Sequence, residues 1–528
     1  MTTATTGAVR SVTVRVDGRP VPGRGSARLL SARVATRLNQ PAQCEVAFAT
    51  SRAGPAPLTG FPLGGSLWLG LAGGGGGAGA GAGAGADAAG AGEPLFTGEI
   101  TCVEQETEAD GTTTVRLRAY DRLHRLRKRQ ELRAFESVTA AGLAGQLAGA
   151  VGLRVAAESD GPLVERLLQH RHTDLELLLE VCGRAGLYLY ADGDELRLVT
   201  LAGRGQPVPL DAGRNLWRAR VEVNLDQAAG SSAALGWHPQ RAEALSASTG
   251  EARSGRQVAQ RLDAGAVGGD GARTLVDQPG RSDDEMEAIA QAAFDVRVAS
   301  AVTVDGVAEG NAALKVGGRV AIGGVSEQVA GVYVLTEVVH TVDAAGHLTA
   351  FSTSPPPVPA AAAAASVTLG TVTAVDDPDG LGRVRVTLPA LGGLDAGWLA
   401  VVCPGAGSGR GIVALPDVDD TVLVALPHGE PASGLVVGSL YGTVAPPDAG
   451  VDGGRVRRWS LRTAEGQSII VDNAGRTLRL GNDVGSFVEL TPDRLTVHAA
   501  TDLVVQAPGR ALTVRARTVD FEHAPQAE

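Results

Sequence analysis

The chain is poor in cysteine, aromatic residues and lysine, and the first two scarcities each exclude a class of protein. Its four cysteines, Cys44, Cys102, Cys182 and Cys403, lie tens of residues apart. This spacing predicts neither a zinc motif nor a dense disulfide framework. Aromatic residues make up 3% of the 528 residues, and there are only two lysines. Few residues are therefore available for base-stacking platforms of the kind that bind single-stranded nucleic acid.

A net basic charge and long apolar runs are also missing. The net charge of -11 at pH 7 argues against a general nucleic-acid binder, because phosphate binding needs a basic surface. No stretch reaches about 18 consecutive apolar residues, and residues 1–18 contain no apolar core of a signal peptide. We expect a soluble chain that is synthesised in the cytoplasm without a signal peptide.

What is present is a series of short strand patterns separated by turn residues, in a chain long enough for several domains. Residues 73–92 contain almost only glycine and alanine, which predicts a flexible loop between two strands. Helical spacing follows near 138–151 and 173–185, then a hairpin across Ala191–Asp194, and a helix capped by Ser282. The expected segments are 1–125 (β-barrel with the loop 73–92), 126–204 (small α+β domain), 205–354 (second β-barrel), 355–366 (Pro/Ala linker), 367–442 (OB-fold), 443–455 (connector), 456–522 (β-helical segment) and 523–528 (tail).

Residues 367–442 contain apolar runs interrupted by turn residues such as Asp377-Pro378-Asp379-Gly380. Five or six short strands in about 75 residues suit a small closed barrel of the OB type. The expected strands are Leu369–Val375, Val384–Leu388, Trp398–Val402, Ile412–Leu415, Val422–Leu426 and Leu435–Leu440.

The last segment repeats pairs of apolar residues every seven to ten residues, with Gly, Asn, Asp or Pro often between them. Short strands at a near-constant period predict a β-helix or prism in which strands stack. One copy is too thin to bury the pairs, whereas three chains would enclose an apolar axis. The predicted core residues of such a trimeric needle are Leu478, Leu480, Val488, Leu490, Leu495, Val497, Leu503, Val505, Leu512 and Val514.

The barrel segment contains several short glycine-rich motifs in a fixed order along the chain. Gly382–Val386, Gly397–Leu399, Pro404–Gly411, His428-Gly429 and Gly438–Tyr441 together resemble the OB domain of VgrG-type spike proteins. That family forms the central spike of contractile injection machines: phage-tail-like particles, extracellular contractile injection systems and type VI secretion systems.

The resemblance implies a mainly β fold with minor α: two hub β-barrels with a small α+β insert, an OB-fold barrel and a C-terminal trimeric needle. It implies a homotrimeric hub and spike that joins a six-fold tail tube to a three-fold needle, which punctures an envelope. Implied partners are the tail tube protein, baseplate components, effector cargo and a PAAR-type tip protein docked around Thr518, Val519, Asp520 and Phe521. The particle would be cytoplasmic before firing or be released from the cell.

Neither a cofactor nor a catalytic site is expected. No Gly-x-Ser-x-Gly motif occurs, and Gly405–Gly411 lacks the Gly-Lys-Ser/Thr ending of a phosphate-binding loop. His170 and His172 could share one face of a strand, but no third ligand stands at a suitable spacing, which favours a structural role. Two alternatives stay open: an OB-fold protein that binds oligosaccharide or nucleic acid, and a cell-wall hydrolase of a baseplate.

Overall fold

The computed structural model describes residues 12–21, 27–50, 61–71, 93–238, 243–269, 271–357 and 365–522. The expected Gly/Ala-rich loop, the tail 523–528 and residues 358–364 of the linker lie outside the described residues. The chain divides into two compact units, Met1–Ser439 and Leu440–Glu528. None of the helices in the described ranges is long and apolar enough to cross a membrane.

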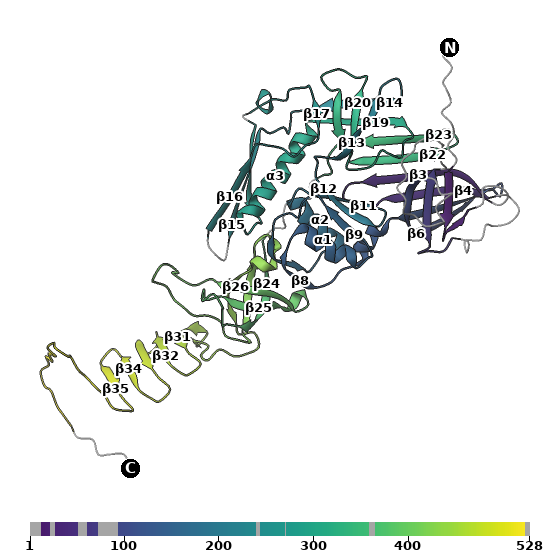
Figure 1. Ribbon diagram of the computed structural model, residues 1–528. Helices are drawn as coiled ribbons and strands as arrows, with labels where there is room; N and C mark the ends of the chain where they lie inside the picture. Colours follow the sequence, from purple (N-terminus) through teal and green to yellow (C-terminus); the bar gives the residue numbers. More distant parts are fainter. Residues whose placement is uncertain are drawn as a thin grey trace. The chain divides into compact units, whose positions relative to one another are not determined.

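The first unit is built on an eleven-stranded sheet that combines strands from both ends of residues 12–352 (Figure 1). In spatial order its strands are β14 (Leu216–Val223), β19 (Val302–Glu309), β23 (Gly346–Ser352), β22 (Glu337–Asp343), β3 (Ala27–Arg37), β4 (Gln43–Thr50), β7 (Thr113–Tyr120), β6 (Glu93–Thr107), β5 (Ser66–Leu71), β1 (Val12–Val16) and β2 (Arg19–Pro20).

The junction of this sheet is the antiparallel pair β3–β22, in which Val34 lies opposite His340. The sequence predicts two separate barrels, but in the described residues their strands pair in one sheet. Each segment nevertheless has its own core, one around Val46, Leu69 and Leu117 and another around Val304 and Val320. Alternating inward apolar residues of the longer strands fill these cores.

Between these strands the chain forms the small α+β part. Its elements are η2 (Arg122–Lys128), β8 (Arg133–Val138), α1 (Ala140–Gly149), β9 (Arg154–Ala157), β10 (Val164–Gln169), α2 (Asp174–Arg184), β11 (Tyr188–Asp192) and β12 (Glu195–Val199). Both predicted helices and the hairpin are confirmed. The Thr173 hydroxyl accepts a hydrogen bond from the Glu176 amide and so caps α2, and the Thr173 amide donates to the Glu176 carboxylate. The two bonds form a complete capping box.

The rest of this part of the chain forms two small sheets and a long helix. One sheet contains β13 (Arg204–Asp211), β20 (Gly318–Gly323), β21 (Gly331–Val334) and β17 (Gln257–Val258), and the other contains β16 (Glu243–Thr249), β15 (Ser231–His238) and β18 (Ala272–Gln278). Helix α3 (Asp283–Ser300) is capped by the Ser282 hydroxyl, as predicted, and packs on β15 and β16.

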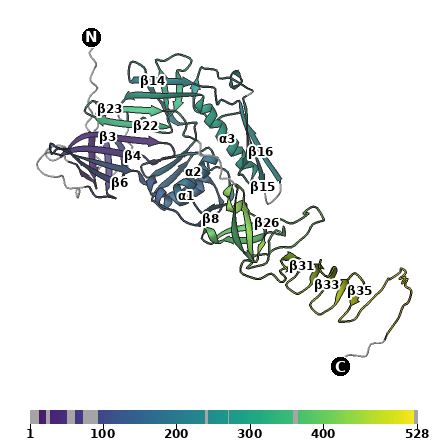
Figure 2. The same ribbon diagram turned by 180° about the vertical axis from the view of Figure 1, so that it is seen from behind.

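Residues 366–440 form a closed five-stranded barrel (Figure 2). Its strands in spatial order are β24 (Ser366–Ala374), β25 (Val384–Leu388), β26 (Leu394–Val401), β28 (Leu435–Leu440) and β27 (Thr421–Leu426). The core contains Val372, Val386, Leu399 and Val424. Five of the six expected strands are present, whereas the prediction of a strand at Ile412–Leu415 is wrong, because those residues form an exposed arm without strand pairing.

The second unit contains the pair β29 (Val451–Asp452) and β30 (Arg455–Val456), followed by an antiparallel meander. The strands of the meander are β31 (Arg458–Arg462), β32 (Ser468–Asp472), β33 (Thr477–Gly481), β34 (Phe487–Leu490) and β35 (Leu495–His498). Residues 499–522 contain no strand in the single chain. The meander is a single layer, with no buried apolar cluster among its described residues.

Candidate assembly surfaces

One face of the β31–β35 meander carries two continuous columns of apolar side chains. Residues directly opposite each other in neighbouring strands share a face, and the registers align these residues across all five strands. The first column contains Trp459, Val471, Leu478, Leu490 and Leu495, and the second contains Leu461, Ile469, Leu480, Val488 and Val497. We call this surface the apolar face.

The opposite face of the meander is mainly polar, although Ile470 and Phe487 also lie on it. Arg479 pairs with Glu489 on the neighbouring strand at 3.2 Å, and its guanidinium lies over the Phe487 ring, 3.8 Å from the centroid. Phe487 in turn stacks on His498. The charged and aromatic side chains of this face thus have partners within the chain, whereas most side chains of the apolar face are in contact with water.

The six predicted needle residues that lie in strands, Leu478 to Val497, all belong to the apolar face. Leu503, Val505, Leu512 and Val514 lie in the segment without strands and are exposed. The predicted docking residues, Thr518, Val519, Asp520 and Phe521, lie in the same segment, and Phe521 is 94% exposed. The single chain therefore brings together the first part of the predicted set and leaves the second part unpaired.

Sequence reasoning missed four residues of the apolar face: Trp459, Leu461, Ile469 and Val471. The signal for them was present, because Arg458–Arg462 and Ser468–Asp472 both place apolar residues at every second position. Their pairs also keep the seven-to-ten-residue period, because Ile469 follows Trp459 by ten residues and precedes Leu478 by nine.

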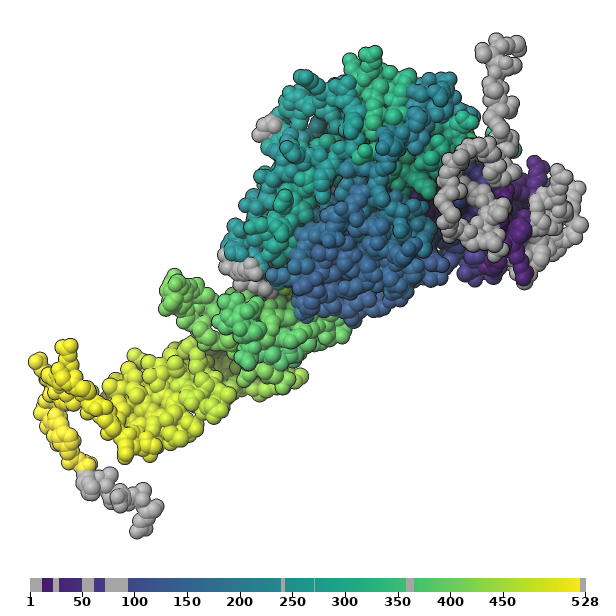
Figure 3. Space-filling view, in the orientation of Figure 1, coloured from purple at the N-terminus to yellow at the C-terminus, as the bar shows by residue number. Residues whose placement is uncertain are grey.

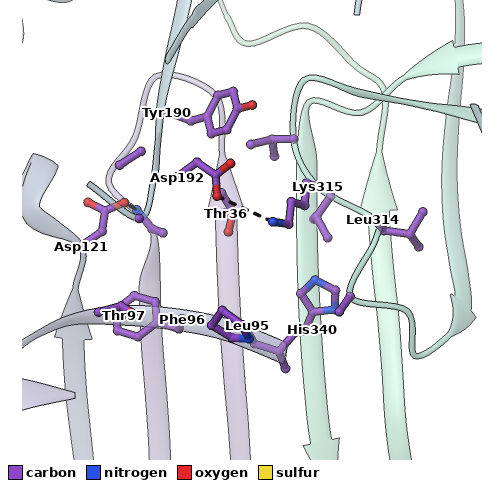
Figure 4. Close-up of a pocket in the computed structure, with 17 residues that line it drawn as sticks. Thr36, Leu95, Phe96, Thr97, Asp121, Tyr190, Asp192, Leu314, Lys315 and His340 are labelled. Carbon is purple, nitrogen blue, oxygen red and sulfur yellow. Dashed lines mark hydrogen bonds and ion pairs between the residues drawn. The ribbon is translucent and has the colours of Figure 1, made fainter. Parts of the chain in front are cut away.

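A cavity of about 170 Å³ lies in the first unit between β3, β6, β11, β22 and residues 312–316 (Figure 4). The Lys315 side chain points toward Asp192, and their charged atoms are 3.7 Å apart. The carboxylate of Asp121 accepts hydrogen bonds from the amides of Ala42 and Leu123, so it caps η2. One ion pair and one capping residue thus supply the charges of the cavity.

Burial shifts three titratable groups of this cavity, Tyr190 among them, whose pKa it raises. It raises the pKa of Asp121 to about 7 although two amides bond the carboxylate, and it lowers the pKa of His340 to about 4, with His347 contributing. The imidazole is therefore neutral at pH 7. Among the described residues that line the cavity there is neither serine nor cysteine, so this lining offers neither of the usual nucleophiles to an acyl-transfer reaction.

His170 and His172 lie with ring centroids 6.1 Å apart, and His172 Nε2 is 3.4 Å from Glu180. No group of three His, Cys, Asp or Glu in the described ranges could hold a metal ion. The two histidines stand near a charged junction, where Arg184 of α2 binds Glu430 of the barrel segment. Arg166 of β10 also donates to the Asp395 carbonyl of β26.

Two family models match the chain. The model described as phage tail baseplate hub (GPD) matches residues 37–346, more than half of the chain. The model described as type VI secretion system/phage-baseplate injector OB domain matches residues 368–441, which is the closed barrel. No curated protein matches the chain.

Solved structures share the fold at low sequence identity. The E. coli c3393 protein, a type VI secretion component described as similar to the T4 tail proteins gp27 and gp5, has a TM-score of 0.50 and 14% identity, covering 81% of this chain and 99% of its own. A chain of the half-lidded Francisella PdpA–VgrG complex has a TM-score of 0.52 and 6% identity, covering 93% and 88%. A chain of the lidded form of that complex has a TM-score of 0.51 and 8% identity, and the match covers 93% of this chain and 81% of the other.

Proposed function

Because the chain belongs to the phage tail baseplate hub (GPD) family, we propose that it is the central hub and spike of a contractile injection machine. The hub would be the first unit, and the needle would be the meander with residues 499–522. In this role the chain joins a six-fold tail tube to a three-fold needle and acts mechanically, without catalysis. It is synthesised in the cytoplasm and works within an assembled particle.

The observation that carries the proposal is the uncovered apolar face. A single sheet layer that exposes apolar side chains on one side is unstable in water, because these side chains have no second layer to pack on. Two further copies supply that layer if three meanders wind around a common axis. The segments around Leu503/Val505 and Leu512/Val514 would then form strands with neighbouring chains, and these exposed side chains would extend the same apolar axis.

The end of this needle is the proposed seat of a conical tip protein. Thr518–Phe521 is the last described stretch with strand-forming composition, and its exposed Phe521 requires a cover. The tail tube protein, the baseplate components and any effector cargo would contact the hub unit.

The test is the mass of the full chain in solution, measured by light scattering beside a chain that ends at Gly442. We expect the full chain to be a trimer of three 53.6 kDa subunits. The shorter chain should lose the trimer or hold it at least tenfold more weakly. A monomeric full chain at micromolar concentration would contradict the autonomous trimeric spike.

A further inference from the structure

The chain between β26 and β27, residues 402–420, forms an arm that projects from the closed barrel (Figures 1 and 3). The arm contains exposed apolar side chains, at Val402, Ile412, Val413, Leu415 and Val418. Val413 is 86% exposed. Within residues 402–420 only Pro416 is buried. An uncharged apolar stretch of this kind, Gly411–Pro416, is exceptional for a surface loop, since loop chemistry is normally polar.

Part of the backbone of the arm is unsatisfied as well. The Ile412 amide bonds to the Pro404 carbonyl, which holds the base of the arm. Within the described part of the chain, the backbones of Val413, Ala414 and Leu415 form no hydrogen bond. An extended segment with open backbone groups and apolar side chains has the properties of a strand that pairs or packs with another molecule.

The same barrel has an apolar outer face. On β24 and β27 the pairs Val367–Ala425 and Leu369–Leu423 point outward, because the alternate residues of both strands fill the barrel core. Val437 on the neighbouring strand β28 is exposed as well. We call these five residues the outer face. A barrel whose outside contacts water would carry polar residues at these positions.

We propose that the arm of one copy packs on the outer face of the next copy. Both surfaces belong to one barrel, yet both stay exposed in the single chain, with Val367 at 67%. The arm therefore does not cover its own face. The stretch Gly411–Pro416 of the arm and the outer face are both uncharged, so burying these two parts together desolvates no charge.

The geometry of this contact differs from that of the needle. Two unlike surfaces of one chain form a head-to-tail contact, which repeats around an axis until the ring closes. The inference rests on the proposed trimeric hub and spike, and it adds a second ring of contacts at the barrel. The needle would then align the three chains along the axis, and the arms would tie them together around it.

The test links the two surfaces covalently between full-length chains. Cys102 and Cys403 are first replaced by serine, since Cys44 and Cys182 are buried. One chain then carries Val413→Cys and a second, distinguished by an affinity tag, carries Leu369→Cys. The chains are mixed by denaturing and refolding together, oxidised with copper phenanthroline and separated on a denaturing gel. The matched control replaces Leu369→Cys by Asp379→Cys, an exposed position in the β24–β25 loop.

We expect a disulfide-linked heterodimer in the Val413→Cys and Leu369→Cys mixture, at least tenfold more abundant than in the control mixture. A single chain carrying both cysteines should yield a covalently closed trimer. Equal linkage in both mixtures, or linkage of Val413→Cys chains to one another, would overturn the proposal. Light scattering on the same samples distinguishes the arm contact from the trimeric spike. A trimer that forms no disulfide-linked heterodimer would contradict only the arm contact, whereas a monomer would contradict the trimeric spike as well.

Discussion

Arg184 Nη2 lies 3.1 Å from Glu430 Oε1, so helix α2 is joined to the barrel segment by an ion pair between residues far apart in the chain. Arg184 also binds Glu180 one turn earlier on the same helix. Both acidic partners are mostly shielded from water. The pair thus connects the α+β part to the barrel inside one compact unit.

Replacing Arg184 by alanine should weaken this connection. A charged hydrogen bond in a largely desolvated site contributes about 2 kcal/mol, and Glu430 would be left without its partner. We expect a lower unfolding temperature and faster proteolysis of the barrel segment. Arg154→Ala is the control, because Arg154 and Asp194 form an exposed pair; equal effects of the two substitutions would contradict the assignment.

Asp174 should be the most sensitive charged position of the α+β part. Its side chain is fully buried and accepts from Arg129, Arg133 and Gln169. Asp174→Ala leaves two arginines without their buried partner, which should cost about 3–5 kcal/mol of unfolding free energy. Differential scanning calorimetry measures the loss. Glu131→Ala, at an exposed carboxylate that binds the same two arginines, should cost much less.

Asp121 and His340 should give opposite pH dependences. The raised pKa of Asp121, about 7 against 3.8, means that the folded state holds a proton that the unfolded state has lost, so stability falls as pH rises from about 4 to 7. The lowered pKa of His340, about 4 against 6.5, means that stability is lost as pH falls from about 6.5 to 4.

The two contributions oppose each other in nearly the same pH window, so single variants should reveal each of them. Asp121→Asn should make the unfolding temperature rise more steeply between pH 4 and 6.5 than in the parent chain. His340→Gln should make it fall more steeply. Thermal scans at half-unit pH intervals measure both slopes, and unchanged slopes in either variant would rule out its titration as the cause.

Neighbouring residues on β35 should differ sharply in their effect on assembly. Val497 belongs to the apolar face, whereas Thr496 points to the polar face beside Glu489. A charge at Val497 would be buried three times around the proposed axis, so Val497→Asp should weaken the trimer at least tenfold. Thr496→Asp should leave it intact. Sedimentation at several protein concentrations measures trimer dissociation for both variants. Equal dissociation of the two variants would show that the apolar face does not line the trimer axis.

The exposed valine of the arm allows a second assembly test. Val413→Asp should not lower the stability of the single chain, because the Val413 side chain is 86% exposed. It should lower the stability of the oligomer by placing a charge in the arm contact. Val267→Asp is the matched control, since this valine is also exposed and lies outside the barrel. A trimer equally stable in both variants would exclude the arm from the interface.

Local patterns predicted local structure well. The hairpin from Tyr188 to Val199 and the cap at Ser282 are confirmed because each depends on a few neighbouring residues. The resemblance to VgrG-type spike proteins is confirmed by the two family models. The run Ile412–Leu415 was misassigned because a buried strand and an apolar arm have the same composition, and periodicity does not show where the partner lies.

The sequence patterns did not predict which residues pair over long distances in the chain. Nothing in Val34 or His340 indicates that they lie opposite each other, because many apolar or polar strands would satisfy the same alternation. The Arg184–Glu430 pair was equally hidden among 47 basic and 58 acidic residues. The alternation of apolar residues marks Trp459 and Ile469, but only the register of the meander shows that Trp459 lies opposite Val471 and Ile469 opposite Leu461.

The β3–β22 pair also has a consequence for how the chain is made. Strand β22 follows β3 by about 300 residues, so β3 leaves the ribosome long before its neighbour exists. At about 5–20 residues per second the open edge of β3 persists for roughly 15–60 s. During that time an unpaired strand can join the same strand of another nascent chain. Production of this protein should therefore depend on chaperone supply more than its final stability suggests.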